Sequence, residues 1–251
     1  MSATPTLDWI DIDKVVEIAV REFRAGADKV LATQTAGPER VEPTLAVVRA
    51  ALAGMSLEEG ALLDVGVGLT KTIQNKIGSF HQEVLGAVDG WSSTGANGGV
   101  IDLKGHSPVL TGARTNVWAE VKMRYNTIKA SDEKAMWDKI KTAVSLAGND
   151  TVGYLFQIIP KTLEPYDCAW APSGVVPNDL VRCADGVTAY HLVTGRPTAL
   201  RELLDAMPYV MAQVVETLMG RGLDVTRNFE HSGAVLADVI DRSIPSRSAL
   251  E

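Results

Sequence analysis

Helical spacing dominates the first third of the chain. Apolar side chains recur every three or four positions in three segments, and aspartates stand in the first turn of the first one. The three segments are residues 8–34, 43–53 and 70–88. Ser56 and Glu59, in the sequence SLEE, have the spacing of a capping box at a helix start. We interpret the glycine-containing stretch at 62–72 as a turn between helices.

Short strands, loops and further helices are predicted in the rest of the chain. A polar, glycine-rich loop is predicted at 92–99 and a proline-rich loop at 164–180. The predicted strands are residues 99–103, 115–123, 152–160 and 187–195. The predicted helices are residues 131–147, 197–220 and 232–242. This order favours one α/β domain with an N-terminal helical part, divided as residues 1–69 and 70–251.

Composition indicates a soluble globular protein. Of the 251 residues, 46% are hydrophobic and 22% are charged, and no apolar run is long enough to cross a bilayer. The acidic start MSATPTLDWIDIDK lacks the basic and apolar parts of a secretory signal. The two cysteines give neither a disulfide framework nor repeated metal-ligand spacing. We therefore expect a reduced, cytoplasmic protein without a membrane partner.

Charge is distributed unevenly along the chain. The formal net charge of -7 argues against a protein that coats nucleic acid non-specifically. Between residues 120 and 141, however, six basic and four acidic side chains leave a net charge of +2. A solvated helix face accounts for much of this local excess.

Three acid-x-lysine triplets are candidates for metal-dependent chemistry. They are DLK at 102–104, EVK at 120–122 and DEK at 132–134. The composition would give about one such triplet by chance, so a match alone carries little weight. The third triplet opens a polar helix and is interpreted as a helix-start feature. The first two lie on adjacent predicted strands.

Strand alternation brings the second triplet together on one face. Side chains of a strand point alternately to opposite faces, so Glu120 and Lys122 share a face, and Asp102 on the neighbouring strand can reach them. Two carboxylates form an oxygen site suited to Mg²⁺, and a nearby lysine can hold a water and offset charge on a phosphorane. Metal-assisted phosphodiester hydrolysis needs these groups. The alternative is a cross-strand cluster of ion pairs in solvent.

The helix predicted at 70–88 supplies three further polar candidates. Glu83 and Lys76 lie on the same flank of its apolar stripe, so Glu83 is either a further acid at the metal or a surface glutamate. His81 faces away from Glu83 and is interpreted as a packed, hydrogen-bonded histidine.

The stretch 62–72 resembles the glycine loop of methyltransferases that bind S-adenosylmethionine, but a short glycine pattern is a weak signal.

The sequences NKIGSFHQEVLGAVDGW, GGVIDL and WAEVKMRYNT together resemble the conserved block of a known family. It is the AvaII/SinI-like family of type II restriction endonucleases, readers of GGWCC or GGNCC, in the PD-(D/E)xK nuclease superfamily. The matching positions are Asn75, Lys76, Ile77, Gly78, His81, Asp102, Ala119, Glu120, Val121, Lys122, Asn126 and Thr127. The match spans residues 74–128, and Ile101 replaces the proline that precedes the first acid in the superfamily.

The resemblance implies a role for each matching residue. Asp102 and Glu120 would ligate Mg²⁺ with the backbone carbonyl of Val121, and Lys122 would position the attacking water. Glu83 would correspond to the helix acid of many members. The residues implied to contact DNA are Asn126, Thr127, Arg124, Lys104 and Lys76. An alternative assignment combines Asp89 with Asp102 and Lys104.

A restriction-endonuclease-like fold follows from the resemblance, with a mixed central sheet flanked by helices. The implied activity is Mg²⁺-dependent cleavage of double-stranded DNA at a short palindrome of the GGWCC or GGNCC type, leaving 5′-phosphates. A palindromic target implies a homodimer, because protein symmetry mirrors the symmetry of the site. The alternatives are a structure-specific repair or recombination nuclease and a non-catalytic DNA-binding protein.

Overall fold

A computed structural model describes residues 4–35, 43–94, 100–220 and 233–246 of the chain. Its helices are α1 Ile12–Thr35, α2 Pro43–Ala53, α3 Leu57–Gly86, α4 Ala130–Ala147, α5 Gly186–Thr194, α6 Ala199–Met219 and α8 Gly233–Asp241. Its strands are β1 Trp91–Ser93, β2 Leu103–His106, β3 Asn116–Arg124, β4 Thr151–Ile159, β5 Asp167–Ala169 and β6 Val181–Asp185. Among these residues, no helix combines the length and the apolar character that a membrane crossing requires.

The strands form one mixed sheet in the order β1-β2-β3-β4-β6-β5. β1, β2 and β3 pair antiparallel, β3, β4 and β6 pair parallel, and β5 closes the far edge antiparallel to β6. A parallel pair needs a crossover connection, and α4 supplies it between β3 and β4. The predicted α/β fold with a mixed sheet between helices is confirmed.

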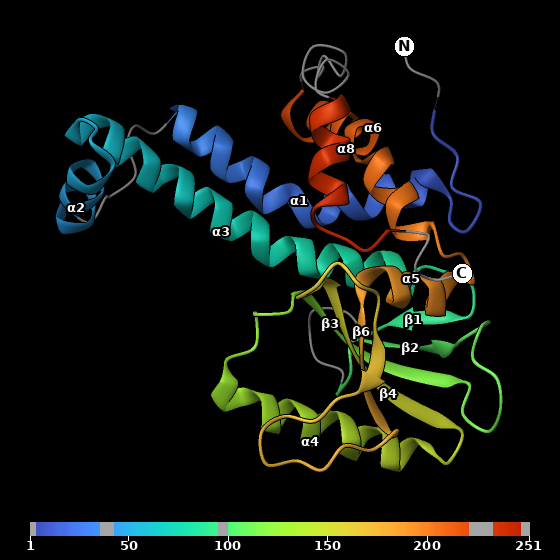
Figure 1. Ribbon diagram of the computed structural model, residues 1–251. Helices are drawn as coiled ribbons and strands as arrows, with labels where there is room; N and C mark the ends of the chain where they lie inside the picture. The colour runs from blue at the N-terminus through green and yellow to red at the C-terminus, as the bar shows by residue number, and fades with distance from the viewer. Residues whose placement is uncertain (1–3, 36–42, 95–99, 221–232, 247–251) are drawn as a thin grey trace.

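Helices cover both faces of the sheet (Figure 1). α4 lies against one face, while α3 and α5 lie against the other and are backed by α1, α6 and α8. Side chains of β3 point alternately to the two helical layers. Val117, Ala119 and Val121 enter the core beneath α3, whereas Trp118 packs on the α4 side. Glu120 therefore lies between the sheet and α4, on the face that sequence alternation predicts.

The N-terminal helices extend beyond the sheet. α1 and α3 run side by side, and α2 lies at their far end (Figure 1). The predicted capping box is confirmed, since the Ser56 hydroxyl accepts from the Glu59 amide at 3.2 Å and the Glu59 carboxylate accepts from the Ser56 amide at 2.7 Å. The proposed division between residues 69 and 70 falls inside α3 and stays a prediction.

The turn predicted at 62–72 is wrong, because α3 continues through this stretch without a break. An interior glycine costs a helix only about 1 kcal/mol relative to alanine, so a glycine does not by itself end a helix. A glycine loop for S-adenosylmethionine follows a strand and opens a helix, whereas this stretch lies in mid-helix. The methyltransferase alternative therefore loses its structural basis.

The strand predicted at 187–195 is also wrong, because these residues form α5 and its C-cap. The Asp185 carboxylate accepts from the backbone amides of Val187 at 2.8 Å and Thr188 at 3.1 Å, which starts the helix. Gly195 ends it at φ +74°, a left-handed conformation that suits glycine. The apolar run is buried on all sides, and such a run has neither strand nor helix period.

Short strands account for the remaining differences. The strand predicted at 99–103 begins instead at Leu103, so Asp102 stands just before β2. β1 and β5 have three residues each; β1 overlaps the start of the predicted loop at 92–99, and β5 lies inside the predicted loop at 164–180. Strands this short carry too few positions for a period of two. Most of the predicted loop at 92–99 falls outside the described residues.

Candidate active site

Two carboxylates meet where β2 begins beside β3. Leu103 pairs with Ala119, which brings the preceding Asp102 to the level of Glu120. Oδ2 of Asp102 accepts a hydrogen bond from the backbone amide of Val121 at 2.9 Å. The Asp102 and Glu120 side chains also share a hydrogen bond. The strand pair therefore brings together the two acids that the sequence analysis selected.

Two lysines neutralise Glu120, which is only 1% exposed. Nζ of Lys122 lies 3.2 Å from Oε2 of Glu120, so the predicted acid and base do share one face of β3. The second partner is Lys139 of α4, whose Nζ donates to Oε1 of Glu120. Each carboxylate oxygen of Glu120 thus accepts from a different ammonium group.

Sequence reasoning missed Lys139 and counted it within a solvated helix face. One signal was present: Lys139 adjoins the buried Ile140 and stands four positions before the buried Ala143. A lysine on the edge of a buried stripe can send its ammonium group toward the sheet. The sequence does not indicate which strand residue it meets.

The two carboxyl groups titrate differently. Burial, together with the hydrogen bond to Glu120 and its charge, raises the pKa of Asp102 to about 6. Burial opposes ionisation of Glu120 as well, but the hydrogen bond from Asp102 and the charges of Lys122 and Lys139 outweigh it and lower the pKa of Glu120. In the metal-free protein, Asp102 therefore keeps its proton up to a higher pH than an exposed aspartate does.

A divalent cation fits this donor set. Two carboxylates close enough to share a proton repel each other when both are ionised, and a cation between them removes that repulsion. Within the described ranges, no third acidic, histidine or cysteine side chain joins the pair. Mg²⁺ keeps several of its waters and is usually bound by one or two protein carboxylates. Two carboxylates without further protein side chains therefore suit Mg²⁺.

Glu83 is held close to this strand pair but on its own partners. Its carboxylate accepts from Arg21 at 2.7 Å and from the Ser93 hydroxyl at 2.5 Å. Ser93 also accepts from Gln82, whose amide nitrogen lies 3.5 Å from the backbone oxygen of Asp102. Glu83 therefore reaches Asp102 through intermediate groups, and no direct contact with the acid pair occurs in the described structure.

The predicted DNA contacts fall into two groups. Arg124, Asn126 and Thr127 are exposed where β3 ends, two to five residues beyond Lys122. Lys104 of β2 lies opposite Trp118 at the other side of the acid pair, with its ammonium 3.9 Å from the centre of the Trp118 ring. Lys76 of α3 forms an ion pair of 3.6 Å with Glu22. The first group, Arg124, Asn126 and Thr127, follows Glu120 and Lys122 along the chain at the end of β3.

The alternative triplet is spread over several surroundings. Asp89 is exposed in the turn before β1, beside a hollow lined also by Asp8 and Lys14. The Lys104 ammonium is directed over Trp118, its cross-strand partner. The Asp102 carboxyl is instead joined to Glu120. These contacts favour the assignment with Glu120 and Lys122.

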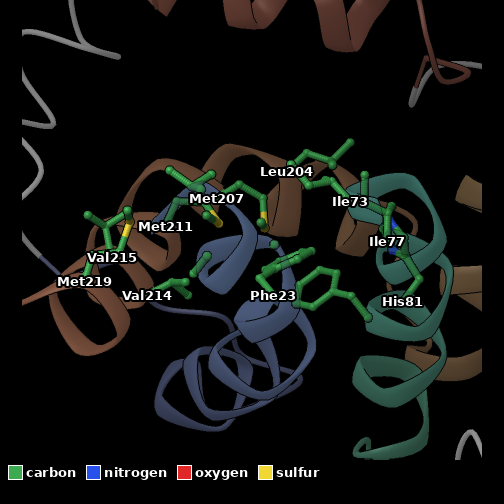
Figure 2. Close-up of a pocket in the computed structure, with 14 residues that line it drawn as sticks. Phe23, Ile73, Ile77, His81, Leu204, Met207, Met211, Val214, Val215 and Met219 are labelled. Carbon is green, nitrogen blue, oxygen red and sulfur yellow. The ribbon is translucent and has the colours of Figure 1, made fainter. Parts of the chain in front are cut away.

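A separate cavity of about 400 Å³ lies between α1, α3 and α6 (Figure 2). Its walls are apolar, with Phe23, Ile77 and Met211 among them, and His81 stands at one end. Nδ1 of His81 lies 2.7 Å from the hydroxyl of Tyr190, and burial lowers the pKa of His81 to about 4. The interpretation of His81 as a packed, hydrogen-bonded residue is confirmed, and the cavity offers no charged group for hydrolysis.

Comparison with known proteins shows the family to which the chain belongs. A sequence profile described as Eco47II restriction endonuclease matches residues 8–216. The type II restriction enzyme Eco47II of Escherichia coli is 35% identical over 163 residues, 60% of this chain and 64% of that enzyme. The type II restriction enzyme Sau96I of Staphylococcus aureus is 25% identical over 157 residues, 59% of this chain and 56% of that enzyme. Each alignment thus spans less than two thirds of the relative. Because the profile covers most of the chain, the protein belongs to the Eco47II restriction endonuclease family.

Proposed function

We propose that this protein is a type II restriction endonuclease that hydrolyses phosphodiesters of double-stranded DNA with Mg²⁺. The observation that carries the proposal is the Asp102–Glu120 pair, held between β2 and β3 with Lys122 at 3.2 Å. Family membership supports the same activity. A non-catalytic DNA-binding protein would have no need for a buried and a half-buried carboxyl group that oppose each other's ionisation.

The proposed roles follow from the position of each group. Asp102 and Glu120 would hold Mg²⁺, together with the backbone carbonyl of Val121. The bound metal would acidify a water and offset negative charge on the phosphorane. Lys122, half-buried beside Glu120, orients the attacking water and stabilises the developing charge. Glu83, fixed by Arg21, supports the site from α3.

DNA is proposed to bind along the exposed end of β3. Arg124, Asn126 and Thr127 lie there, and Lys104 and Lys76 would contact phosphates farther along the surface. The proposed target is a short palindrome of the GGWCC or GGNCC type, cut to leave 5′-phosphates by a homodimer. A two-fold enzyme on a two-fold site presents one active site to each strand. The expected cytoplasmic location stays a prediction.

Cleavage of plasmid DNA with Mg²⁺ tests the proposal directly. The wild type should give discrete, reproducible fragments, whereas a structure-specific nuclease would give no fixed pattern. Sequencing of the fragment ends identifies the target, and ligation before and after phosphatase treatment tests for 5′-phosphates. No cleavage by the wild type across varied salt and divalent metals would reject the activity.

Variants separate the site from the activity. Glu120→Gln and Lys122→Met should lower cleavage by about 10³-fold or more while DNA binding persists. Lys134→Met is the matched control, because Lys134 pairs with Asp138 on the exposed side of α4. If Glu120→Gln cuts as well as the wild type, the assignment of the site is wrong even where the enzyme cleaves DNA.

A further inference from the structure

Glu120 accepts from two ammonium groups that differ in origin. Lys122 comes from the same strand, two residues on, whereas Lys139 comes from α4 on the adjoining layer. The Glu120 side chain is 2% exposed, and that of Lys139 is 38% exposed. Lys139 therefore reaches a buried carboxylate from the solvent-facing edge of the site.

The ion pair with Glu120 is not an ordinary helix-surface pair. Pairs along one helix form between residues three or four apart, and the positions at that distance from Lys139 hold Ala135, Met136, Thr142 and Ala143. The adjacent Asp138 already pairs with Lys134 at 2.9 Å. Lys139 has no competing acid on its own helix, so Glu120 is its partner across the layers.

A metal held by Glu120 changes this arrangement. Both oxygens of Glu120 accept from ammonium groups, so a divalent cation that takes one of them competes with a lysine. The Lys139 side chain is 38% exposed and that of Lys122 is 26% exposed, so Lys139 is the group with more room to turn outward into solvent. Lys122 remains beside Glu120 on β3.

We propose that Lys139 holds Glu120 in the metal-free protein and is released by the metal to bind the phosphodiester of the substrate. This inference rests on the proposed function and adds a second ammonium group to it. With both carboxyl groups ionised, their charges balance those of the two ammonium groups in the metal-free site. Entry of a divalent cation leaves a local excess of positive charge, which matches an anionic DNA backbone.

Opposite effects on metal binding and on cleavage are the signature of this role. Lys139→Met keeps the length of the side chain and removes its charge. In DNA-free protein, calorimetric titration with Mn²⁺ should show affinity raised by about tenfold, because a competitor is gone. Cleavage of plasmid DNA at saturating metal should fall by about 10²-fold, because a cation at the phosphate is gone.

Two controls isolate the charge of Lys139. Lys134→Met removes a lysine from the exposed side of the same helix and should change neither quantity. Lys139→Arg keeps a cation and should retain Mn²⁺ affinity within about threefold of the wild type. Thermal denaturation of each metal-free variant establishes that the fold is intact.

The outcomes are distinct. Weaker or unchanged Mn²⁺ binding by Lys139→Met overturns the competition and leaves Lys139 as a structural ion pair. Unchanged cleavage overturns its contact with the phosphodiester. If Mn²⁺ binding tightens as expected but the wild type itself cleaves no DNA, the proposed function fails while the competition at Glu120 stands.

Discussion

Asp102→Asn should make the metal-free protein more stable while removing a carboxylate that the proposed reaction needs. The Asn side chain has nearly the same shape, so its oxygen can still accept from the Val121 amide, as Asp102 does at 2.9 Å. Its amino group can donate to Glu120. What disappears is the ionisation of a half-buried carboxyl group beside another acid.

The magnitude follows from the pKa of Asp102, which is raised from 3.8 to about 6 in the folded protein. A difference of roughly two units, at about 1.4 kcal/mol each, sets an upper limit of about 3 kcal/mol. The folded state binds this proton more tightly than the unfolded chain does. Its contribution to stability is therefore complete below about pH 4, is lost as the pH rises toward about 6, and stays lost above that.

Urea denaturation in the presence of a chelator measures the effect. We expect Asp102→Asn to raise the free energy of unfolding by about 1–3 kcal/mol at about pH 8, and by less at about pH 5. Asp89→Asn is the matched control, because Asp89 is exposed in the turn before β1. It should change the free energy of unfolding by less than about 0.5 kcal/mol at either pH.

A lower stability of Asp102→Asn at both pH values would refute the reasoning, since the neutral side chain would then be the poorer fit. An equal gain at both pH values would also refute it, because ionisation of Asp102 would not be the cause. Cleavage assays on the same preparations should show at least about 10²-fold lower activity. A stabilised and inactive variant is the expected combination.

Three further predictions concern pH and packing. Calorimetric affinity for Ca²⁺ should rise with pH through about 6 and level off above about 7, with proton release on binding, because the proton on Asp102 must leave. The pKa of His81 is lowered to about 4, so its contribution to stability is present above about pH 6.5 and is lost as the pH falls toward 4. His81→Gln, which keeps a polar partner for Tyr190, should remove that slope in urea denaturation. Gly153→Ala places a Cβ against Ile140 Cγ2, closer than van der Waals contact, and should lower the free energy of unfolding by about 1–3 kcal/mol, measured the same way.

The predictable part of the site is the part that lies within one strand pair. Alternation along β3 places Val117 in the core and Glu120 on the opposite face, and the structure agrees. Pairing of the preceding strand, β2, with β3 was also predictable, so Asp102 could be assigned to the same place. Such local rules depend only on the period of the backbone.

The unpredicted part depends on how layers pack. Lys139 meets Glu120 because α4 crosses the sheet at one particular position, and no sequence spacing encodes that position. Glu83 lies on the predicted helix, yet Arg21 of α1 holds its carboxylate, a partner 62 residues away. α5 was mistaken for a strand because its buried run has no period, although Asp185 marked its start.

Trp118 gives the site an optical property. It precedes Glu120 by two positions on the same face of β3, with the Lys104 ammonium 3.9 Å from its ring centre. A cation over an indole ring interacts with the electrons that absorb and emit light. If Lys104 binds a DNA phosphate as proposed, its ammonium leaves the ring and the emission of Trp118 should change. In a variant that keeps Trp118 as the single tryptophan, DNA binding beside the acid pair could then be followed without a label.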